Sequence, residues 1–507
     1  MRILCMEEMY AADRYTIDQV GVRDETLMEC AGQAVISALL PRLRTTDAIT
    51  VLAGVGNNGG DGFVIARRLK NLGFKAQLWL IPPLEKVRGA ALCALNCFQA
   101  SGYHHHQYHA KLYSRIAQSD VIIDALLGIG MNGELRSPYD EVIRAVNESD
   151  AIVYSVDIPS GVSADGADVS LAVQADVTFT IQHPKLSAFL YPAASCYGKL
   201  EVVDIGIPPQ ASGCLINQRL LWTEQDYLAA LPQRSADAHK GSNGRGLIAG
   251  GCPTMLGAPL ISAAACLNSG IGLLSLAIPK ASRPAAAGRI LEATYLDCEE
   301  EDGYLTHLEV PSQTSVVAVG MGLSRDPRCA GILLDILSKN IPTVIDADGL
   351  FHLQGQFELL HRRTAVTVLT PHMGEMARLC GCSVDRVRRE RFSISREFAV
   401  EHGVYLVLKG PYTIVTTPEG DQYVNTSGNA GLAKGGSGDA LTGIIAAYLP
   451  NYSDPGKAII NAVYAHGKAA DNLVRQGMRP ESLTASDLVS ALSFLAQPPD
   501  SEQVNSR

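Results

Sequence analysis

The chain has 507 residues, of which 47% are apolar, 19% charged and 6% aromatic. This composition excludes a disordered protein, because so apolar a chain can bury enough surface to offset the entropy lost on folding. The net charge of −10 argues against a general nucleic-acid binder. Residues 1–222 carry 18 basic and 23 acidic side chains, so this part and the remainder each have a net charge of −5, and neither is a charged tail.

Targeting segments are not evident. Residues 1–8 form no apolar run of signal-peptide length, and no segment approaches the roughly 18 uncharged apolar residues of a membrane span. The 12 cysteines are scattered, several within apolar segments such as 264–267, which predicts reduced, buried thiols in a cytoplasmic protein. Cys380 and Cys382 lack a second cysteine or histidine pair nearby, so we interpret them as structural.

The first part of the chain alternates between helical and strand patterns. Helices are expected at 7–20, 24–40 and 62–72, and strands at 49–53, 76–81, 121–125, 151–156, 177–181 and 200–205. This alternation predicts a largely parallel, doubly wound sheet. The histidine-rich segment 103–109 is interpreted as a solvated loop, because adjacent histidines rarely converge on one ion and no carboxylate pattern accompanies them.

The second part belongs to the same class without repeating the sequence. Strands are expected at 246–249, 273–278, 316–319, 343–345, 366–369 and 404–408, followed by helices at 440–449, 455–475 and 485–495. A turn-rich stretch at 207–213 precedes a new amphipathic start at Thr223, which places a boundary at about 215–222. We therefore expect two α/β domains, at 1–215 and 222–500.

A glycine-rich loop, 54–62, follows the first strand of the first domain and contains the spacing G-x-G-x-x-G. Glycines let the backbone approach a pyrophosphate, and the following helix offers unpaired N–H groups. The ribose-binding acid expected about 20 residues later is missing, which disfavours an ordinary dehydrogenase. The loop could serve only as a turn, but Asn57, Asn58 and Asp61 add polar chemistry that a turn does not need.

Two further strands also end in polar loops. One runs from Asp124 through the glycines at 128–133 to a helix for which Ser137 is the expected cap and Pro138 a first-turn residue. The other strand, expected at 151–156, is followed by the polar loop 157–161. Open α/β sheets bind ligands at the carboxyl ends of their strands. Together the three loops predict one ligand site.

The segments 57–62, 128–133 and 157–161 resemble those of NAD(P)H-hydrate epimerase domains, over about residues 1–215. The resemblance implies a Rossmann-like fold. It also implies that the hydrated dinucleotide binds Asn57, Asn58, Gly59, Gly60, Asp61, Gly128, Ile129, Gly130, Met131, Asn132, Gly133, Glu134, Tyr139 and Asp157. Potassium would be held by Asn58, Asp124 and Ser160, whose oxygens suit such a cation. Asp157 is the candidate acid–base group for inverting the C6 centre of the hydrate.

The second domain contains another glycine-rich loop, residues 429–441. It is not a phosphate-binding P-loop, because Lys434 follows Ala433 and precedes Gly435. The segment 435–439 instead opens an apolar helix, whose free amides could stabilise a transferring phosphoryl group. Asp439, in the first turn, could accept a proton from an attacking hydroxyl. The alternative is a simple glycine-rich helix start in which Asp439 only interacts with the helix dipole.

This loop resembles that of the ribokinase-like fold. Together with 239–244, 250–259, 370–375 and 408–413 it resembles ADP-dependent NAD(P)H-hydrate dehydratases, over roughly 225–500. The resemblance implies hydrate binding by Ala258, Gly322, His372 and Asp439. It implies nucleotide binding by Lys409, Gly410, Pro411, Tyr412, Thr413 and Gly438. Taken alone, His372 would more simply be a local cap. The run 320–324 and Met255 depart from the family pattern, which affects contacts more than the reaction.

The two resemblances imply one repair function for hydrated nicotinamide cofactors. The first domain would interconvert the R and S forms of NADHX and NADPHX, and the second would dehydrate the S form with ADP and Mg²⁺, giving AMP and phosphate. One alternative is a vitamin-precursor kinase fused to a dinucleotide-binding module, which the 57–61 loop disfavours. Another is an N-terminal interaction module, which the retained Asp124, Asp157 and Ser160 disfavour. A homo-oligomer is expected only by family analogy.

Overall fold

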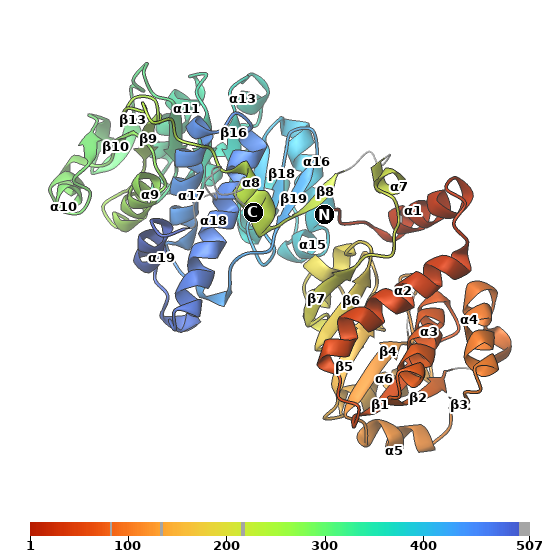
Figure 1. Cartoon of the computed structure of the whole chain (residues 1–507). Helices are drawn as coiled ribbons and strands as arrows, with labels where there is room; N and C mark the ends of the chain where they lie inside the picture. Colours follow the sequence, from red (N-terminus) through yellow and green to blue (C-terminus); the bar gives the residue numbers. More distant parts are fainter. Residues whose placement is uncertain (82–83, 132–134, 214–217, 496–507) are drawn as a thin grey trace. The chain divides into compact units, whose positions relative to one another are not determined.

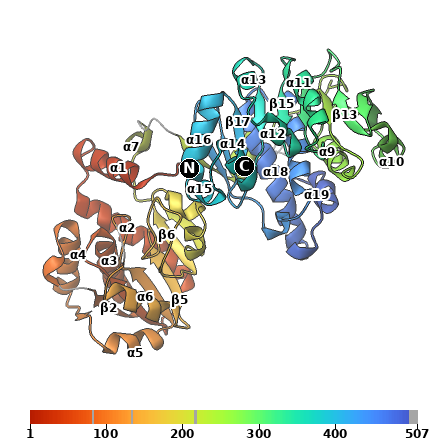
Figure 2. The same cartoon turned by 180° about the vertical axis from the view of Figure 1, so that it is seen from behind.

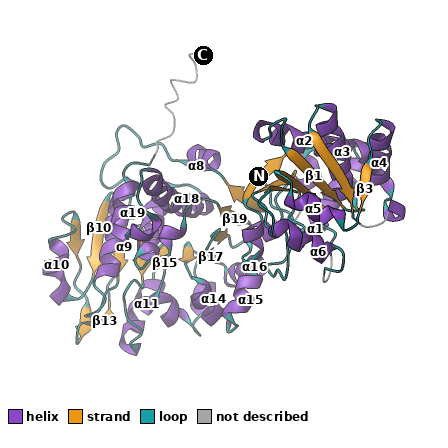
Figure 3. Ribbon diagram, turned by 90° about the horizontal axis from the view of Figure 1, so that it is seen from below, coloured by secondary structure: helices purple, strands orange, loops and turns teal. Residues whose placement is uncertain are grey.

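The chain folds into two compact units, Met1–Ile216 and Asn217–Arg507 (Figure 1). The computed structural model describes residues 1–81, 84–131, 135–213 and 218–495. Each unit combines helices with one large sheet, as the colouring by secondary structure shows (Figure 3). The α/β class predicted from the sequence is therefore confirmed. Within the described ranges, no helix is long and apolar enough to cross a membrane.

The first unit contains a seven-stranded parallel sheet in the order β3-β2-β1-β4-β5-β6-β7. The strands are β1 (Ala48–Ala53), β2 (Lys75–Leu80), β3 (His105–Gln107), β4 (Val121–Ala125), β5 (Ile152–Val156), β6 (Val177–Ile181) and β7 (Lys199–Val203). The strand order reverses between β1 and β4. In open parallel sheets such a reversal opens a crevice at the carboxyl ends of the strands.

Helices cover both faces of this sheet (Figure 2). They are α1 (Met6–Asp18), α2 (Asp24–Leu39), α3 (Asn57–Asn71), α4 (Gly89–Ala100), α5 (Lys111–Ala117), α6 (Tyr139–Asn147) and α7 (Pro209–Gly213), with 3₁₀ turns at Leu40–Arg42, Leu84–Lys86, Leu186–Phe189 and Ala193–Cys196. Val51 of β1 joins the core under α2, α3 and α4, whereas the adjacent Leu52 joins the core under α5 and α6. Successive side chains of a strand point to opposite faces, so both are buried.

Three local predictions for this unit are wrong. Helix α3 begins at Asn57 rather than at residue 62, so the Asn–Asn–Gly–Gly segment is its first turn. Ser137 does not cap α6, because Pro138 occupies the N-cap position and the Ser137 hydroxyl donates to Glu141 instead (2.9 Å). The histidine-rich segment is not only a loop, since it contains the edge strand β3, where the His106 ring stacks on Trp79.

The second unit contains a ten-stranded sheet in the order β11-β10-β9-β14-β15-β16-β17-β18-β19-β8. Its strands are β8 (Arg219–Trp222), β9 (Arg245–Ala249), β10 (Leu273–Ala277), β11 (Ala293–Tyr295), β14 (Val316–Val319), β15 (Thr343–Ile345), β16 (Thr367–Leu369), β17 (Tyr405–Leu408), β18 (Ile414–Thr416) and β19 (Gln422–Asn425). The pairs β17–β18 and β18–β19 are antiparallel. A small hairpin, β12 (Glu299–Glu301) and β13 (Tyr304–His307), lies outside this sheet.

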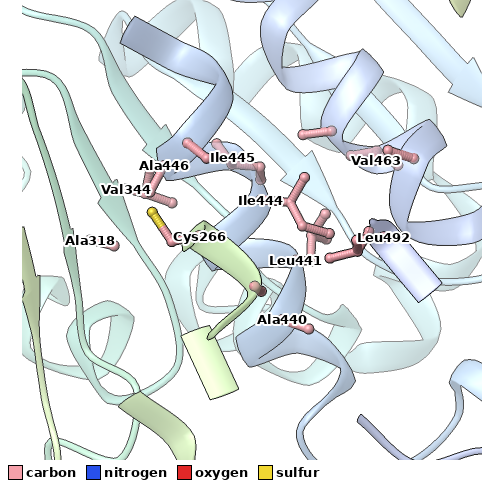
Figure 4. Close-up of a cluster of buried hydrophobic side chains, with 14 of the residues drawn as sticks. Cys266, Ala318, Val344, Ala440, Leu441, Ile444, Ile445, Ala446, Val463 and Leu492 are labelled. Atoms are coloured by element: carbon pink, nitrogen blue, oxygen red, sulfur yellow. The ribbon is translucent and has the colours of Figure 1, made fainter. Parts of the chain in front are cut away.

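Helices complete the second unit. They are α8 (Glu224–Ala230), α9 (Gly257–Asn268), α10 (Arg283–Ala287), α11 (Ala330–Leu337), α12 (Asp348–Leu353), α13 (Glu358–His361), α14 (Met373–Cys380), α15 (Val384–Arg389), α16 (Arg391–His402), α17 (Ser437–Tyr448), α18 (Pro455–Arg475) and α19 (Ala485–Leu492), with 3₁₀ turns at Lys280–Ser282, Pro327–Cys329, Ala430–Leu432, Leu449–Asn451 and Pro480–Ser482. Ile444 and Ile445 place α17 in the core, between Val344 of β15 and Val463 of α18 (Figure 4). This core holds the glycine-rich start of α17 in place.

The cysteine prediction is confirmed in part. Every cysteine in the described part of the chain is a free thiol. Cys266 is buried in the core of the second unit, as expected. The prediction of burial is wrong for Cys30, Cys93, Cys97 and Cys380, which are exposed.

Candidate active sites

The glycine-rich turn of the first unit brings the ends of β1 and β4 together. A Cβ atom at Gly54 would lie 1.9 Å from the carbonyl oxygen of Leu126, and one at Gly59 would lie 2.0 Å from the carbonyl oxygen of Gly54. Both positions therefore require glycine, because any side chain would collide with backbone. Asn58 and Asp61, in the first turn of α3, are both buried at this junction.

The three predicted potassium ligands lie together behind this turn. Asp124 is the last residue but one of β4 and is fully buried; its Oδ1 accepts from the Ser160 hydroxyl (2.5 Å) and its Oδ2 from the Ser160 amide (2.9 Å). Burial raises the pKa of Asp124, although the hydrogen bonds from Ser160 and Ser155 oppose that effect. The Asn58 amide donates to the carbonyl oxygen of Leu127 (2.8 Å), which also accepts from the Ser160 hydroxyl (3.3 Å).

One atom of this group is left without a partner. Asn58 Oδ1 is buried and accepts no hydrogen bond. A buried polar atom in this state costs about 1–3 kcal/mol. The neighbouring groups supply carboxylate, hydroxyl and carbonyl oxygens, which are the ligands that hard cations prefer. The donor set therefore fits a potassium ion.

Asp157 follows β5 in a strained conformation. Its φ of 68° lies in the left-handed region, which non-glycine residues seldom adopt and which often marks functional sites. The side chain of Lys185 is fully buried and its ammonium donates to Asp157 Oδ1, to the Thr180 hydroxyl (3.2 Å) and to the Ile181 carbonyl oxygen (3.1 Å). The Ile181 amide also donates to Oδ1 (3.2 Å). The bonds from Lys185 and from the Ile181 amide hold Oδ1, and no described residue bonds to Oδ2.

Two charged residues of this site were missed by sequence reasoning. Lys185 lies outside the three loops, and no motif marked it. Asp13 comes from α1, and its pKa is raised to about 6 by burial and by the charge of Asp157, against the effect of Lys185. Burial, Asp157 and Asp13 raise the pKa of Asp61 well above its usual value. Asp61 therefore holds its proton more tightly than an ordinary carboxyl group does.

The remaining predicted residues of the first site are placed as follows. Gly128 packs against Asn58, since a Cβ there would lie 3.0 Å from the Asn58 Cβ. The Tyr139 hydroxyl donates to the Ile81 carbonyl oxygen (3.0 Å), and burial raises its pKa to about 12. Ile129 and Met131 flank Gly130 in the same loop and are partly exposed. Asn132, Gly133 and Glu134 lie outside the described residues.

In the second unit, an ion pair between a buried aspartate and a partly buried lysine lies beneath the first turn of α17. Lys409 follows β17 and donates to Asp346 Oδ1 (2.8 Å), while Thr442 donates to Asp346 Oδ2 (2.7 Å). A Cβ at Gly438 would lie 3.3 Å from the Lys409 ammonium, so this cation is next to the free amides of the helix. The site thus combines a helix N-terminus with a fixed positive charge, both of which favour phosphate.

Asp439 shares this turn and is half-buried. Burial and the negative charge of Asp346 raise its pKa to about 7, and Lys409 opposes the shift. A carboxylate with a pKa near the working pH is well suited to accept a proton. The Ser262 hydroxyl donates to the Asp439 carbonyl oxygen (2.7 Å), which ties the turn to α9. His466 contacts the Ser437 carbonyl oxygen (2.9 Å) from α18 and supports the same turn.

The predicted hydrate-binding residues of this unit lie in two places. Gly322 and Ala258 are neighbours, because a Cβ at Gly322 would lie 3.3 Å from the Ala258 Cβ. His372 is the N-cap of α14: its Nδ1 accepts from the Gly374 amide (3.0 Å) and the Glu375 amide (3.2 Å). Its ring is largely exposed, so the local-cap alternative describes what it does in this structure. Glu375 also lies 3.9 Å from the Lys409 ammonium.

A buried arginine fixes the predicted nucleotide segment. Arg391 of α16 donates to the carbonyl oxygens of Pro411 (2.6 Å) and Tyr412 (3.1 Å), and burial lowers its pKa to about 10. The Thr413 hydroxyl donates to the Gly410 carbonyl oxygen (3.0 Å). Sequence reasoning missed Arg391, Thr442 and Asp346. Asp346 directly follows a strand, the same signal that located the loops of the first unit.

Comparison with known proteins identifies the family. Residues 24–187 match the family described as YjeF-related protein N-terminus, and residues 246–493 match that described as NAD(P)H-hydrate dehydratase. The bifunctional NAD(P)H-hydrate repair enzyme of Moorella thermoacetica is 35% identical over 98% of this chain and 96% of its own length. The chain belongs to the bifunctional NAD(P)H-hydrate repair enzymes. The family inferred from the motifs is confirmed.

Other members of the family show the same extent of similarity. The repair enzyme of Thermofilum pendens is 35% identical over 97% of this chain and 95% of its own length. Among solved structures, an ADP/ATP-dependent NAD(P)H-hydrate dehydratase from Bacillus subtilis, co-crystallised with ATP and Mg²⁺, is 32% identical over 54% of this chain and 96% of that one, with a TM-score of 0.49. Because the relatives match both halves of the chain, a vitamin-precursor kinase is the less supported alternative.

Proposed function

We propose that the chain repairs hydrated nicotinamide cofactors at two separate sites. Residues 1–215 interconvert the R and S forms of NADHX and NADPHX, and residues 222–500 dehydrate the S form at the expense of ADP. The observation that carries this proposal is that each unit places one candidate acid–base carboxylate, Asp157 or Asp439, at the ligand-binding edge of its sheet. Asp157 is paired with the buried Lys185, and the charge of Lys409 acts on Asp439.

Epimerisation requires that one bond at C6 is broken and remade on the opposite face, with a proton moved to and from a heteroatom on C6. Asp157 can move this proton through Oδ2, because Lys185 and the Ile181 amide hold Oδ1. Asp61, whose pKa is raised by burial, is a candidate proton donor at this site. Potassium would be held by Asn58, Asp124 and Ser160, and it would supply a fixed positive charge beside the anionic dinucleotide.

Dehydration is assisted by phosphoryl transfer, because hydroxide is a poor leaving group. The C6 hydroxyl attacks the β-phosphorus of ADP, its proton passes to Asp439, and AMP leaves. Phosphate then departs from C6 while C5 loses a proton, which restores NADH or NADPH. Lys409 and the free amides of α17 stabilise the negative charge that develops on the phosphoryl group.

Magnesium would neutralise the nucleotide phosphates. Within the described ranges, no cluster of three or more His, Cys, Asp or Glu side chains could hold a metal ion. The ion therefore fits as one bound chiefly by the nucleotide, which is the usual arrangement for Mg²⁺.

One assay tests both halves of the proposal. The purified chain is given the separated R and S hydrates of NADH with ADP or ATP, and the reappearance of NADH is followed. We expect full recovery from both epimers, with ADP as the phosphate donor. Recovery of NADH from the S hydrate alone would contradict the epimerase assignment. Phosphorylation of a small alcohol without any recovery of NADH would favour the alternative of a vitamin-precursor kinase.

Asp157→Asn tests the epimerase residue directly. We expect the folded variant to lose R-to-S conversion and to keep dehydration of the S hydrate, because the second site is separate. Full epimerase activity in this variant would show that Asp157 is not the acid–base group.

A further inference from the structure

Ser437, the first residue of α17, faces His466 of the neighbouring helix α18. Both side chains are buried, since Ser437 is 7% exposed and His466 is 8% exposed. The His466 Nε2 atom lies 2.9 Å from the Ser437 carbonyl oxygen and 3.2 Å from the Ser437 hydroxyl oxygen. One nitrogen of the imidazole ring therefore contacts both oxygen atoms of the residue that precedes Gly438.

These two contacts fix the direction of the hydrogen bond between His466 and Ser437. A carbonyl oxygen has no proton to donate, so the contact of 2.9 Å requires that His466 Nε2 carries the proton. This requirement holds for the neutral ring and for the charged ring. The same N–H group is shared with the Ser437 hydroxyl oxygen, which therefore accepts rather than donates.

The hydroxyl proton of Ser437 is left without an acceptor. Among residues 218–495, the described part of this unit, the group within hydrogen-bond distance of the hydroxyl is His466 Nε2, which already carries a proton. A buried donor that lacks an acceptor is unfavourable. This position therefore favours a ligand that supplies an acceptor oxygen.

The surroundings of the hydroxyl favour a phosphate oxygen as this acceptor. Ser437 is followed by Gly438, at which a Cβ atom would lie 3.3 Å from the Lys409 ammonium. The free amides in the first turn of α17 add a partial positive charge. An anionic oxygen at this place would thus be attracted by the ammonium and by the helix start, and it would accept the hydroxyl proton.

The part of α18 that carries His466 is also linked to the predicted nucleotide segment, residues 409–413. The Ser427 hydroxyl donates to the carbonyl oxygen of Tyr464, two residues before His466 (2.9 Å). The Asn425 amide donates to the Thr413 carbonyl oxygen (2.9 Å). His466 thus joins the start of α17 to the strand end that adjoins residues 409–413, and ADP is expected to bind at both places.

We propose that the Ser437 hydroxyl binds a phosphate oxygen of ADP, and that His466 is a positioning residue that makes this hydroxyl a donor toward the nucleotide. The inference rests on the proposed dehydratase function. It adds a side-chain donor to the backbone amides and the lysine already described at this site. His466 acts through Ser437 and does not contact the nucleotide itself.

The first test removes the hydroxyl. Full-length wild type, Ser437→Ala and Ser490→Ala are compared, with Ser490 as an exposed control on α19. The probe is ADP with Mg²⁺, whose Kd is measured by calorimetry without the hydrate. We expect Ser437→Ala to raise the Kd and the KM for ADP about tenfold to hundredfold, the usual effect of losing a hydrogen bond to a charged group. The KM for the S hydrate should not change, and Ser490→Ala should match the wild type.

The second test changes the group that holds the hydroxyl. The amide nitrogen of glutamine can take the place of His466 Nε2, whereas the asparagine side chain ends one bond earlier. His466→Gln should therefore bind ADP as the wild type does, and His466→Asn should bind it more weakly. The double variant Ser437→Ala, His466→Asn should bind ADP no more weakly than the weaker single variant, because the histidine acts through the serine. R-to-S conversion, a reaction of the first unit, should be unchanged in all of them.

Several results would overturn the inference. An unchanged Kd for ADP in Ser437→Ala would show that the hydroxyl does not bind the nucleotide. A raised KM for the S hydrate alone would assign the hydroxyl to the pyrophosphate of the hydrate instead. Additive losses in the double variant would show that His466 does not act through Ser437.

Thermal unfolding of each variant ensures that binding is measured on folded protein. Alanine is a good helix former and is smaller than serine, so Ser437→Ala should keep the fold. If the wild type recovers no NADH from the S hydrate with ADP, the proposed dehydratase function has failed. If the wild type is active and Ser437→Ala binds ADP equally well, only the role of Ser437 has failed.

Discussion

The ammonium of Lys409 lies 2.8 Å from Asp346 Oδ1, beneath the first turn of α17. This contact joins residues from the ends of two strands, β17 and β15, to the helix start that carries Gly438 and Asp439. The lysine thus keeps its charge in a partly buried position, because Asp346 neutralises it. The same carboxylate also raises the proton affinity of Asp439. Asp346 therefore acts on both Lys409 and the candidate base.

Asp346→Asn should shift the pH dependence of dehydration. Asp439 accepts a proton only when ionised, so the wild-type kcat/KM should rise as the pH increases through about 7. Removing the charge of Asp346 lowers the pKa of Asp439, and Lys409, without its partner, lowers it further. In Asp346→Asn, the rise in kcat/KM should therefore move to lower pH by about one pH unit. Glu358→Gln, an exposed change on α13, is the control. An unchanged profile in Asp346→Asn would show that the two carboxylates are not coupled.

Asp439→Ala should abolish nucleotide-dependent dehydration and leave epimerisation untouched. The loss of a positioned proton acceptor costs about 10²–10⁴-fold in rate. The two activities are measured on the same preparation, as NADH recovery from the S hydrate and as R-to-S conversion. If a folded variant loses both activities together, the two-site proposal is wrong.

Lys185→Met should destabilise the first unit as well as inactivate it. This change leaves the buried Asp157 carboxylate without its partner, and breaking such a pair costs about 3–5 kcal/mol. Denaturant unfolding, followed through the transition of the first unit, measures the loss. The double variant Lys185→Met, Asp157→Asn should recover much of this stability, because no unpaired charge remains. If the free energy of unfolding of Lys185→Met lies within about 1 kcal/mol of the wild-type value, the pair contributes little to stability.

Potassium should stabilise the first unit through the unpaired oxygen of Asn58. An ion that binds only the folded state adds about 2.7 kcal/mol at a concentration one hundred times its Kd. Thermal unfolding is compared in potassium chloride and choline chloride at equal ionic strength. The gain in melting temperature in potassium chloride should disappear in Asp124→Asn. It should persist in Glu148→Gln, an exposed substitution in the same unit. Equal melting temperatures of the wild type in the two salts would argue against a potassium site here.

Local pattern was enough to predict the fold class and the meeting of three loops in the first unit. Strands and helices are encoded in short stretches of sequence, so their alternation predicted parallel sheets, which the structure confirms. Glycine-rich and acidic segments that follow strands must gather at one edge of such a sheet. For this reason the loops at Asn58, Asp124 and Ser160 could be predicted to meet. The short strands β18 and β19 were missed, although β14 and β15, which are equally short, were predicted.

The electrostatic partners were decided only by the tertiary structure. Lys185 lies 28 residues from Asp157 along the chain, and Lys409 lies 63 residues from Asp346. Nothing in periodicity or motif spacing links such pairs, since they form only when separate strands are brought side by side. Burial then determines what they do: it raises the pKa of Asp439 to about 7 and that of Asp13 to about 6. The sequence alone thus determined which residues could reach a site, and desolvation and charge pairing in the folded chain decided their proton affinities.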